Sequence, residues 1–206
     1  ISSNLNIMIK AAEKASKSVI RDFGEVEKLQ VSKKGPRDFV TKTDKNVEKI
    51  LIEELSKTKK NYSFLSEEIG SIENKDKDNI WIIDPIDGTK SFISGIPLWG
   101  TLIGLEVNDI PELGIIDLPS TKERYLGSNS LKRAIRITDG VTENVLTSNQ
   151  KELINLKFGY TSEEMFDDRR SREILDKVNE LVGMTRTGGD CFFYSLSINW
   201  DLSKSL

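Results

Sequence analysis

The sequence predicts an α+β or layered α/β fold, and three observations support this prediction. The N-terminal part carries apolar residues at the spacing of amphipathic helices. The middle part carries short apolar runs of strand length, two of which are joined by a tight-turn sequence. The last part mixes both patterns, and elements of both kinds pack in layers around a shared core in this fold class.

Three segments have the pattern of amphipathic helices. Residues 4–23 place one apolar stripe opposite lysines and glutamates. A second helix follows Asp44, which is a suitable N-cap residue. A third helix is predicted over 171–182. The residues expected to face the core are Leu5, Ile9, Ala12, Ala15, Val19 and Phe23 in the first helix, Val47, Ile50, Leu51 and Leu55 in the second, and Ile174, Leu175, Val178 and Leu181 in the third.

Six apolar runs predict strands at 62–65, 80–83, 98–107, 112–118, 124–126 and 144–147. Asn108, Asp109 and Pro111 predict a turn between the third and fourth runs, so these two strands should form an antiparallel hairpin. The basic segment 33–37 and the polar segment 71–79 are predicted to be loops.

Polar residues dominate between 128 and 143, and this change in composition predicts a division of the chain. We expect residues 1–130 to form an N-terminal α+β region and residues 131–206 to form a C-terminal α/β region. A chain of 206 residues is long enough for one large domain or two small ones.

The composition excludes several classes of function. The net charge of -3 gives no basic face for nucleic acid, and no apolar run approaches the roughly 20 residues of a membrane span. The single cysteine, Cys191, excludes an intrachain disulfide and favours the reducing cytoplasm. The absence of histidine excludes a Ser-His-Asp triad, a Cys-His pair and His-ligated zinc. Metal chemistry would therefore use oxygen ligands, which favour magnesium, manganese or calcium.

The stretch IWIIDPIDGTKSF combines a buried strand with two carboxylates. Asp84 and Asp87 lie at the carboxyl end of the strand, where Pro85 is expected to stop strand pairing. Gly88 and Thr89 then open a short helix, and the backbone amides at a helix N-terminus can bind phosphate. The stretch thus places ligands for a cation beside donors for an anion.

Glu67 and Glu68 end another predicted strand. If that strand lies beside the one that ends at Asp84, several carboxylates converge, and a divalent cation would relieve their repulsion. Two plainer interpretations stay open. The pattern DPxDG also suits a tight turn with side-chain hydrogen bonds to the backbone, and adjacent glutamates are often a solvated surface pair. Trp81 and Phe92 are predicted to be core residues.

Taken together, these motifs resemble those of the inositol monophosphatase family of magnesium-dependent, lithium-sensitive phosphatases. The resemblance is carried by IWIIDPIDGTKSF, FLSEE, RTGGD and DFVTKTD, and it extends from about residue 5 to residue 191. Within the family, GTKSFISGIPLWGTLIGL and RTGGDC are most similar to the histidinol-phosphatase-like branch. The resemblance implies a layered αβαβα sandwich of the inositol monophosphatase and fructose-1,6-bisphosphatase type, and a homodimer.

The resemblance also implies roles for individual residues. Glu67 and Thr89 are expected to hold and help deprotonate the attacking water, while Asp44 and Glu68 match positions beside the ligands or at a third metal. The matching positions are Glu67, Asp84, Asp87 and the carbonyl of Ile86 for the metals, Glu67, Thr89 and Asp44 for catalysis, Gly88 and Thr89 for phosphate, Gly189, Asp190 and Cys191 for the substrate alcohol, and Glu68 and Lys33 around the metals. Taken alone, Lys33 has the pattern of a solvated lysine, and Cys191 that of a small core residue.

The chain departs from the family after RTGGDC. The family continues with a helix, a strand and a late Trp-Asp pair whose aspartate completes the metal site, whereas this sequence ends at Leu206. Trp200 and Asp201 follow Asp190 too closely, without the intervening strand. We therefore expect an incomplete C-terminal layer, a missing metal ligand and exposed apolar surface.

The expected function is hydrolysis of a small phosphorylated alcohol, such as histidinol phosphate or inositol monophosphate, by metal-activated water. Mg²⁺ is the expected metal, Mn²⁺ is an alternative, and Li⁺ should inhibit. Two alternatives stay open: a catalytically impaired remnant or binding protein of the same fold, and a 3'(2'),5'-bisphosphate nucleotidase. The expected partner is a small phosphorylated metabolite, with neither nucleic acid nor membrane, and the expected state is a cytoplasmic homodimer.

Overall fold

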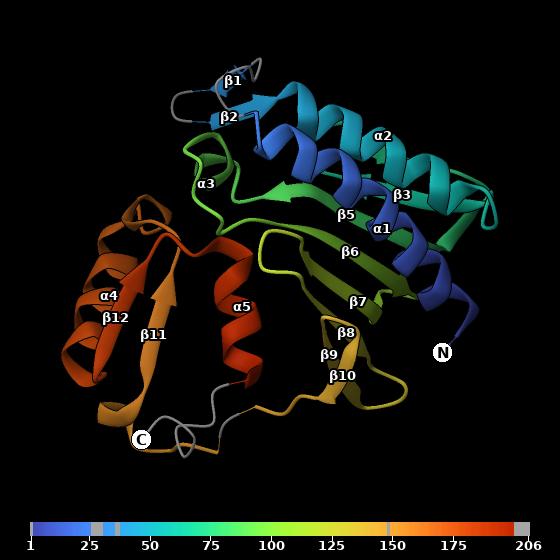
Figure 1. Ribbon diagram of the computed structural model, residues 1–206. Helices are drawn as coiled ribbons and strands as arrows, with labels where there is room; N and C mark the ends of the chain where they lie inside the picture. Colours follow the sequence, from blue (N-terminus) through green and yellow to red (C-terminus); the bar gives the residue numbers. More distant parts are fainter. Residues whose placement is uncertain (1, 26–30, 36–37, 148, 200–206) are drawn as a thin grey trace. The chain divides into compact units, whose positions relative to one another are not determined.

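An eight-stranded sheet dominates the first of two units into which the chain divides, Ile1–Val145 and Leu146–Leu206 (Figure 1). The computed structural model describes residues 2–25, 31–35, 38–147 and 149–199. The elements of the first unit are α1 (Ser3–Phe23), β1 (Val31–Gly35), β2 (Asp38–Thr41), α2 (Lys42–Ser56), β3 (Tyr62–Ser66), β4 (Gly70–Ile72), β5 (Asp76–Asp87), α3 (Thr89–Ile93), β6 (Gly100–Val107), β7 (Ile110–Leu118), β8 (Glu123–Ser128), β9 (Arg133–Thr138) and β10 (Val141–Asn144).

The strand order in the large sheet is β10-β9-β8-β7-β6-β5-β3-β4. β3 and β5 are parallel, and the other neighbouring strands are antiparallel. β1 and β2 form a separate antiparallel pair. The mixed sheet with its covering helices confirms the predicted layered α+β class. The expected division after residue 130 falls between β8 and β9, which are hydrogen-bonded neighbours, and the chain divides after Val145 instead.

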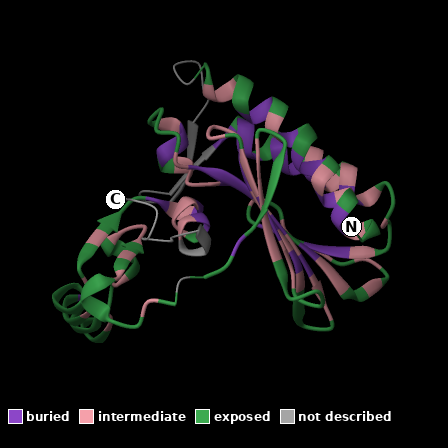
Figure 2. Ribbon diagram, turned by 60° about the horizontal axis from the view of Figure 1, so that its bottom comes forward, coloured by how far each residue is buried: buried purple, intermediate pink, exposed green. Residues whose placement is uncertain are grey.

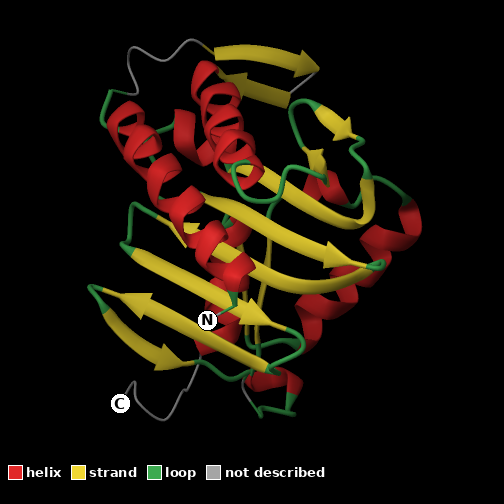
Figure 3. Ribbon diagram, turned by 90° about the vertical axis from the view of Figure 1, so that its right-hand side faces the viewer, coloured by secondary structure: helices red, strands yellow, loops and turns green. Residues whose placement is uncertain are grey.

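Helices α1 and α2 lie side by side along one face of this sheet (Figures 1 and 3). The predicted stripe of α1 is largely confirmed, and Ser2 caps the helix by accepting a hydrogen bond from the Leu5 amide at 3.2 Å. Figure 2 shows buried residues gathered in α1, α2 and the central strands. The core residues with no more than 2% exposure include Met8, Ala12, Ala15, Val19, Val47, Leu51, Leu55, Phe64, Trp81, Ile83, Phe92, Trp99, Ile103 and Leu105.

β6 and β7 form the predicted hairpin. Val107 pairs with Ile110, which leaves Asn108 and Asp109 as a two-residue loop. Both loop residues have positive φ, 51° and 61°, which is the backbone conformation of a type I′ turn. Asn and Asp are the side chains that adopt this region most easily after glycine, so the local sequence specifies the turn.

Several predicted element boundaries are wrong because backbone pairing, rather than side-chain polarity, decides them. The predicted loop 71–79 contributes to β4 and to the start of β5. The predicted strand 144–147 overlaps the sheet only at Asn144, the last residue of β10, while β9 had no prediction. Part of the basic segment 33–37 lies in β1, and residues 36 and 37 fall outside the described residues. Strands can pair through their backbone amides and carbonyls even when their side chains are polar, provided that these side chains point to solvent.

The second unit contains a two-stranded parallel pair and two longer helices. Its elements are η2 (Leu153–Asn155), β11 (Lys157–Tyr160), η3 (Glu163–Met165), α4 (Arg169–Leu181), β12 (Met184–Thr187) and α5 (Asp190–Asn199). The predicted third helix is confirmed as α4, but its predicted inward face is partly wrong. Leu175 is buried, whereas Ile174 and Leu181 are 52% and 53% exposed.

The Gly-Gly loop of RTGGDC lies between β12 and α5. Gly188 has a φ of 77°, a left-handed conformation that glycine adopts without strain. Gly189 is buried, and a β-carbon built there would lie 2.5 Å from the ring of Phe193. The ring of Phe193 also closes over Gly159 of β11, where an added β-carbon would lie 2.9 Å away. Both glycines therefore make room for one aromatic ring.

None of the helices in the described ranges combines the length and the apolar character needed to cross a membrane.

Replacing Gly189 by alanine should destabilise the protein by about 1–3 kcal/mol, because the added methyl group overpacks the ring of Phe193. Urea denaturation followed by circular dichroism measures this change. Gly114→Ala is the matched control, since a β-carbon added at Gly114 meets no atom of the described residues within 4 Å apart from its neighbours in the chain. Equal stability of Gly189→Ala and wild type would show that the ring does not define the loop.

Candidate active site

The carboxyl end of β5 contains a β-bulge. β5 runs through Asp87, so the prediction that Pro85 stops strand pairing is wrong. Asp84 pairs with Leu102 and Asp87 pairs with Gly100. The paired residues are three positions apart in β5 but only two positions apart in β6. One extra residue is accommodated there, which defines a bulge. Pro85 lacks an amide hydrogen, and this irregular part of the ladder tolerates it because a regular hydrogen bond is not required there.

The bulge brings Asp84 and Asp87 to the same face of the sheet. In a regular strand, residues three apart point to opposite faces. Leu102 and Gly100 are two residues apart, and therefore share a face of β6, so the two aspartates opposite them also share that face. Thr101, the intervening residue of β6, donates a hydrogen bond from Oγ1 to the carbonyl of Pro85 at 2.8 Å and holds the bulge.

Glu67 and Glu68 follow β3, the parallel neighbour of β5. The amide of Glu67 donates to the carbonyl of Ile83 at 3.2 Å, which extends the β3–β5 ladder by one bond. Because the carboxyl ends of parallel strands lie at the same edge of a sheet, these glutamates emerge beside Asp84. The structure therefore brings Glu67, Asp84 and Asp87 to one edge, as the sequence predicted.

The environment of Asp84 disfavours its charged form. Burial, followed by the negative charges of Glu67 and Asp87, raises the pKa of Asp84 to about 9. The negative charge of Asp44 acts in the same direction. Among the described residues, Oδ1 of Asp84 is buried and has no hydrogen-bond partner. A buried acceptor without a donor is unfavourable unless something else binds it.

Asp44 reaches the same cluster from the start of α2. Its prediction as the N-cap is wrong, because Thr41 caps the helix and Asp44, the third residue of the helix, completes a capping box with Thr41. One carboxylate oxygen of Asp44 accepts from the amide of Thr41 at 2.9 Å, and the other lies 3.4 Å from Oγ1 of Thr89. Oγ1 of Thr89 has one proton, which it can donate either to Asp44 or to the carbonyl of Ile86 at 3.0 Å. Burial raises the pKa of Asp44, although hydrogen bonds from Thr41 oppose this.

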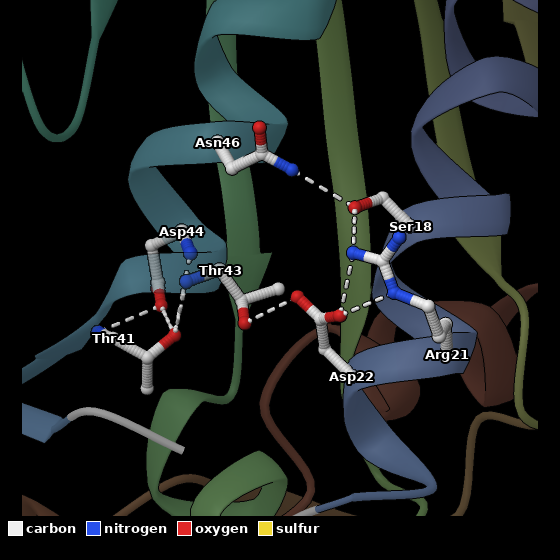
Figure 4. A network of polar contacts seen from close by, with 7 residues as sticks. All are labelled: Ser18, Arg21, Asp22, Thr41, Thr43, Asp44 and Asn46. Carbon is white, nitrogen blue, oxygen red and sulfur yellow. Dashed lines mark hydrogen bonds and ion pairs between the residues drawn. The ribbon is translucent and has the colours of Figure 1, made fainter. Parts of the chain in front are cut away.

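A polar network fixes the start of α2 against the end of α1 (Figure 4). Thr43 donates from Oγ1 to Asp22 at 2.9 Å, and the side-chain amide of Asn46 donates to Ser18 at 2.9 Å. Because Asp22 and Ser18 belong to α1, these bonds position Asp44, which lies between Thr43 and Asn46 along the helix.

An aromatic cluster holds the loop that carries Gly88 and Thr89. The ring of Phe92 in α3 lies 5.5 Å from Phe23 of α1 and 5.1 Å from Trp99, and Phe23 lies 5.1 Å from Trp99. Gly88 has a φ of 93°, which lets the chain turn directly from β5 into α3. The predicted short helix is thus confirmed, and the predictions of Phe92 and Trp81 as core residues are confirmed.

The chemistry of the cluster fits a hard divalent cation, but the cluster is not a complete metal centre. Glu67, Asp84, Asp87 and the Ile86 carbonyl offer oxygen donors, which Mg²⁺ prefers. The buried Oδ1 of Asp84 fits a coordinating role because it has no donor among the described residues. However, no three histidine, cysteine or acidic side chains in the described part of the chain have the arrangement of a formed metal-binding site.

The remaining predicted residues belong to the second unit or have side chains outside the described set. Lys33 belongs to β1, but its side chain is outside the described residues. Gly189, Asp190 and Cys191 belong to the second unit, and Cys191 is buried. Asp190 begins α5 with a φ of 42°, and its neighbour Gly189 packs on Phe193. Residues 200 and 201 lie outside the described residues.

Sequence reasoning missed Glu48, which lies in α2 and is 1% exposed. Its carboxylate accepts hydrogen bonds from the turn that carries Glu67 and Glu68. The available signal was its position on the same helical face as Leu51 and Leu55, where a glutamate interrupts an apolar stripe.

Curated relatives share part of their length with this chain. An inositol-1-monophosphatase of Mesorhizobium japonicum is 48% identical over 124 residues, which are 60% of this chain and 47% of the relative. A protein named Nus factor SuhB of Haemophilus influenzae is 36% identical over 121 residues, which are 59% of this chain and 45% of the relative. The chain thus spans about half the length of the curated relatives it matches.

The structure also resembles solved structures. The extragenic suppressor protein suhB of Bartonella henselae matches with a TM-score of 0.87 and 31% identity, over 95% of this chain and 74% of that chain. A family model described as the inositol monophosphatase family matches residues 2–194, which include every element of the sheet and most of the second unit. The chain therefore belongs to the inositol monophosphatase family.

Proposed function

We propose that this protein is a magnesium-dependent phosphomonoesterase that hydrolyses a small phosphorylated alcohol by direct attack of water. The observation that carries this proposal is the bulge that turns Asp84 and Asp87 to one face beside Glu67, where a buried oxygen of Asp84 has no donor within the part of the chain that the structure describes. Membership of a phosphatase family and similarity to relatives named inositol-1-monophosphatase support it. Inositol monophosphate is the preferred candidate substrate, and histidinol phosphate remains an alternative.

Glu67, Asp84, Asp87 and the Ile86 carbonyl would hold the metal. When bound, Mg²⁺ supplies positive charge that neutralises the carboxylates and the phosphate and lowers the pKa of water. The backbone amides of Gly88 and Thr89 are proposed to bind the phosphate oxygens. Gly189, Asp190 and Cys191 are proposed, from the family resemblance, to contact the alcohol part of the substrate.

Thr89 and Asp44 can take the proton of the attacking water. A hydroxyl has one proton and two lone pairs, so Oγ1 of Thr89 can accept from water while it donates toward Asp44, 3.4 Å away. Burial raises the pKa of Asp44 and so makes it a stronger base than an exposed aspartate. Glu67 is the second proposed acceptor of this proton. Because the chain has no histidine, Cys191 is buried and the aspartates of the site are assigned to the metal and to proton transfer, we propose that no phosphoenzyme forms.

A second candidate is a catalytically impaired member of the family, or a binding protein with the same fold. The observation that favours it is the lack of a formed three-residue metal group in the described part of the chain. A 3'(2'),5'-bisphosphate nucleotidase is a further alternative within the enzyme class. Use of Mn²⁺, inhibition by Li⁺, a homodimeric state, cytoplasmic location and roles for Lys33 and Glu68 near the metals rest on the resemblance alone and stay predictions.

Asp84→Asn should reduce magnesium-dependent phosphate release by at least about 100-fold, because charge stabilisation of the transition state is usually the largest catalytic contribution. The measurement is phosphate release from inositol-1-phosphate, histidinol phosphate and adenosine 3',5'-bisphosphate, with and without Mg²⁺. The control is Asp78→Asn, which removes an exposed carboxylate from the other end of the same strand. Retained activity in Asp84→Asn would refute the metal-site assignment, and inactive but folded wild type would favour the second candidate.

In metal-free protein, Asp84→Asn should become increasingly more stable than wild type as the pH rises from 5 to 9. The folded-state pKa of Asp84 is raised to about 9, from a usual value of about 3.9. Its protonated form is thus favoured by folding, and the associated stability is lost as the pH rises through the folded-state pKa. Asparagine does not titrate and so avoids this loss.

Thermal unfolding in EDTA across this pH range measures the effect, and each kcal/mol corresponds to about 2–4 °C for a chain of this size. Added Mg²⁺ should raise the melting temperature of wild type more than that of the variant. A difference between the two proteins that does not change with pH would contradict the assigned environment of Asp84.

A further inference from the structure

Glu48 is a buried carboxylate that the proposed chemistry does not use. It is 1% exposed, in the middle of α2, and lies on the helical face that packs on the sheet. Burying a carboxylate costs free energy unless hydrogen-bond donors compensate it. A glutamate at this position therefore requires specific partners, since an apolar residue would pack there without that cost.

Three hydrogen-bond donors to Glu48 come from one short turn. Its Oε1 accepts hydrogen bonds from the Ser66 hydroxyl, from the Glu68 amide at 3.2 Å and from the Ile69 amide at 3.0 Å. Along the chain, Glu67 lies between the donor residues Ser66 and Glu68. The single oxygen thus holds both ends of the turn that presents the Glu67 side chain at the edge beside Asp84.

The same helix also positions Asp44. Asp44 and Glu48 are four residues apart in α2, and side chains with this spacing lie on the same face of a helix. Asp44 contacts Thr89, which follows β5, and Glu48 contacts the turn that follows β3. One rigid helical turn therefore sets the position of the turn after β3 relative to that of the loop after β5.

We propose that Glu48 is a positioning residue, which holds the Ser66–Ile69 turn so that the carboxylate of Glu67 meets Asp84 and Asp87 in a geometry that binds a divalent cation. This inference rests on the proposed function, because it assigns the turn to the magnesium site. Glu48 itself does not contact the cation. Residues of this kind, which orient metal ligands through hydrogen bonds, typically contribute a factor of about 10–100 to metal affinity.

The test compares Glu48→Gln with wild type. Glutamine keeps the size of the side chain but replaces charge-assisted hydrogen bonds with weaker neutral ones. We expect the Mg²⁺ concentration that gives half-maximal phosphate release to rise about 10–100-fold, with little change in the substrate KM at saturating Mg²⁺. Calorimetric titration of Mg²⁺ without substrate should show the same loss of affinity. Ser66→Ala, which removes one donor to the same oxygen, should shift both quantities in the same direction but less.

Hydrogen exchange provides a readout that is independent of activity. The amides of Glu68 and Ile69 should exchange faster in Glu48→Gln than in wild type, while the amides of β5 keep their protection. The matched control is Glu53→Gln, which removes an exposed carboxylate of the same helix that pairs with Lys49 at 3.9 Å. It should leave exchange and Mg²⁺ dependence unchanged.

The outcomes separate this inference from the proposed function. Wild type that neither binds Mg²⁺ nor releases phosphate would refute the proposed function, whatever Glu48→Gln does. If wild type is active, unchanged Mg²⁺ affinity in Glu48→Gln would refute the positioning role. Lower global stability with an unchanged Mg²⁺ requirement would also refute it, because that result indicates a role in folding alone.

Discussion

The proposed site depends on one extra residue in β5. Without the bulge between Asp84 and Asp87, the pleat of the strand would send these two carboxylates to opposite faces of the sheet. With it, they share a face with each other and lie near Glu67 at the end of the parallel neighbour β3. The arrangement concentrates negative charge in a partly buried place, and the raised pKa of Asp84 is the direct electrostatic consequence. A bound cation would remove this repulsion between the carboxylates.

The scaffold around the bulge is rigid for identifiable reasons. Helix α2 is tied to α1 by hydrogen bonds from Thr43 and Asn46, and the loop after β5 is held by the packing of Phe92 on Phe23 and Trp99. These contacts lie in the well-packed first unit. They fix α2 and the loop after β5 without using the side chains that carry the proposed chemistry. Carboxylates have both roles in this account: Glu67, Asp84 and Asp87 are proposed metal ligands, and Glu48 holds the turn that carries Glu67.

Local patterns in the sequence predicted much of this structure. The stripe of α1, the β6–β7 hairpin with its Asn108-Asp109 loop, and the strand that ends in Asp84 all follow from periodicity and turn chemistry. Contacts between distant segments were not predictable in the same way. Pro85 indicated the end of a strand, whereas pairing with β6 accommodates it in a bulge. β9, β10 and the β11–β12 pair have short or polar sequences whose strand conformation comes from their neighbours.

The charged residues also divide into those predictable from local sequence and those that depend on contacts between distant segments. Glu67, Asp84 and Asp87 were found from their position after apolar runs, and the fold places them at one edge. Glu48 was overlooked because glutamate in a charged helix is usually exposed, and its three donors lie 18 to 21 residues further along the chain. The roles expected for Gly189, Asp190 and Cys191 came from resemblance. The structure supplies a packing reason for Gly189, and that reason is independent of any substrate.

Calorimetric titration of metal-free protein with Mg²⁺ at neutral pH, in two buffers of different ionisation enthalpy, shows whether the carboxylates at the end of β5 bind a cation. If Glu67, Asp84 and Asp87 form a cation site, Mg²⁺ should bind and release protons, because Asp84 with a pKa of about 9 is protonated before the cation arrives. The apparent enthalpy should then differ between the two buffers. A well-folded protein that takes up no Mg²⁺ at millimolar concentrations would contradict the account, and the carboxylates at the end of β5 would need another explanation.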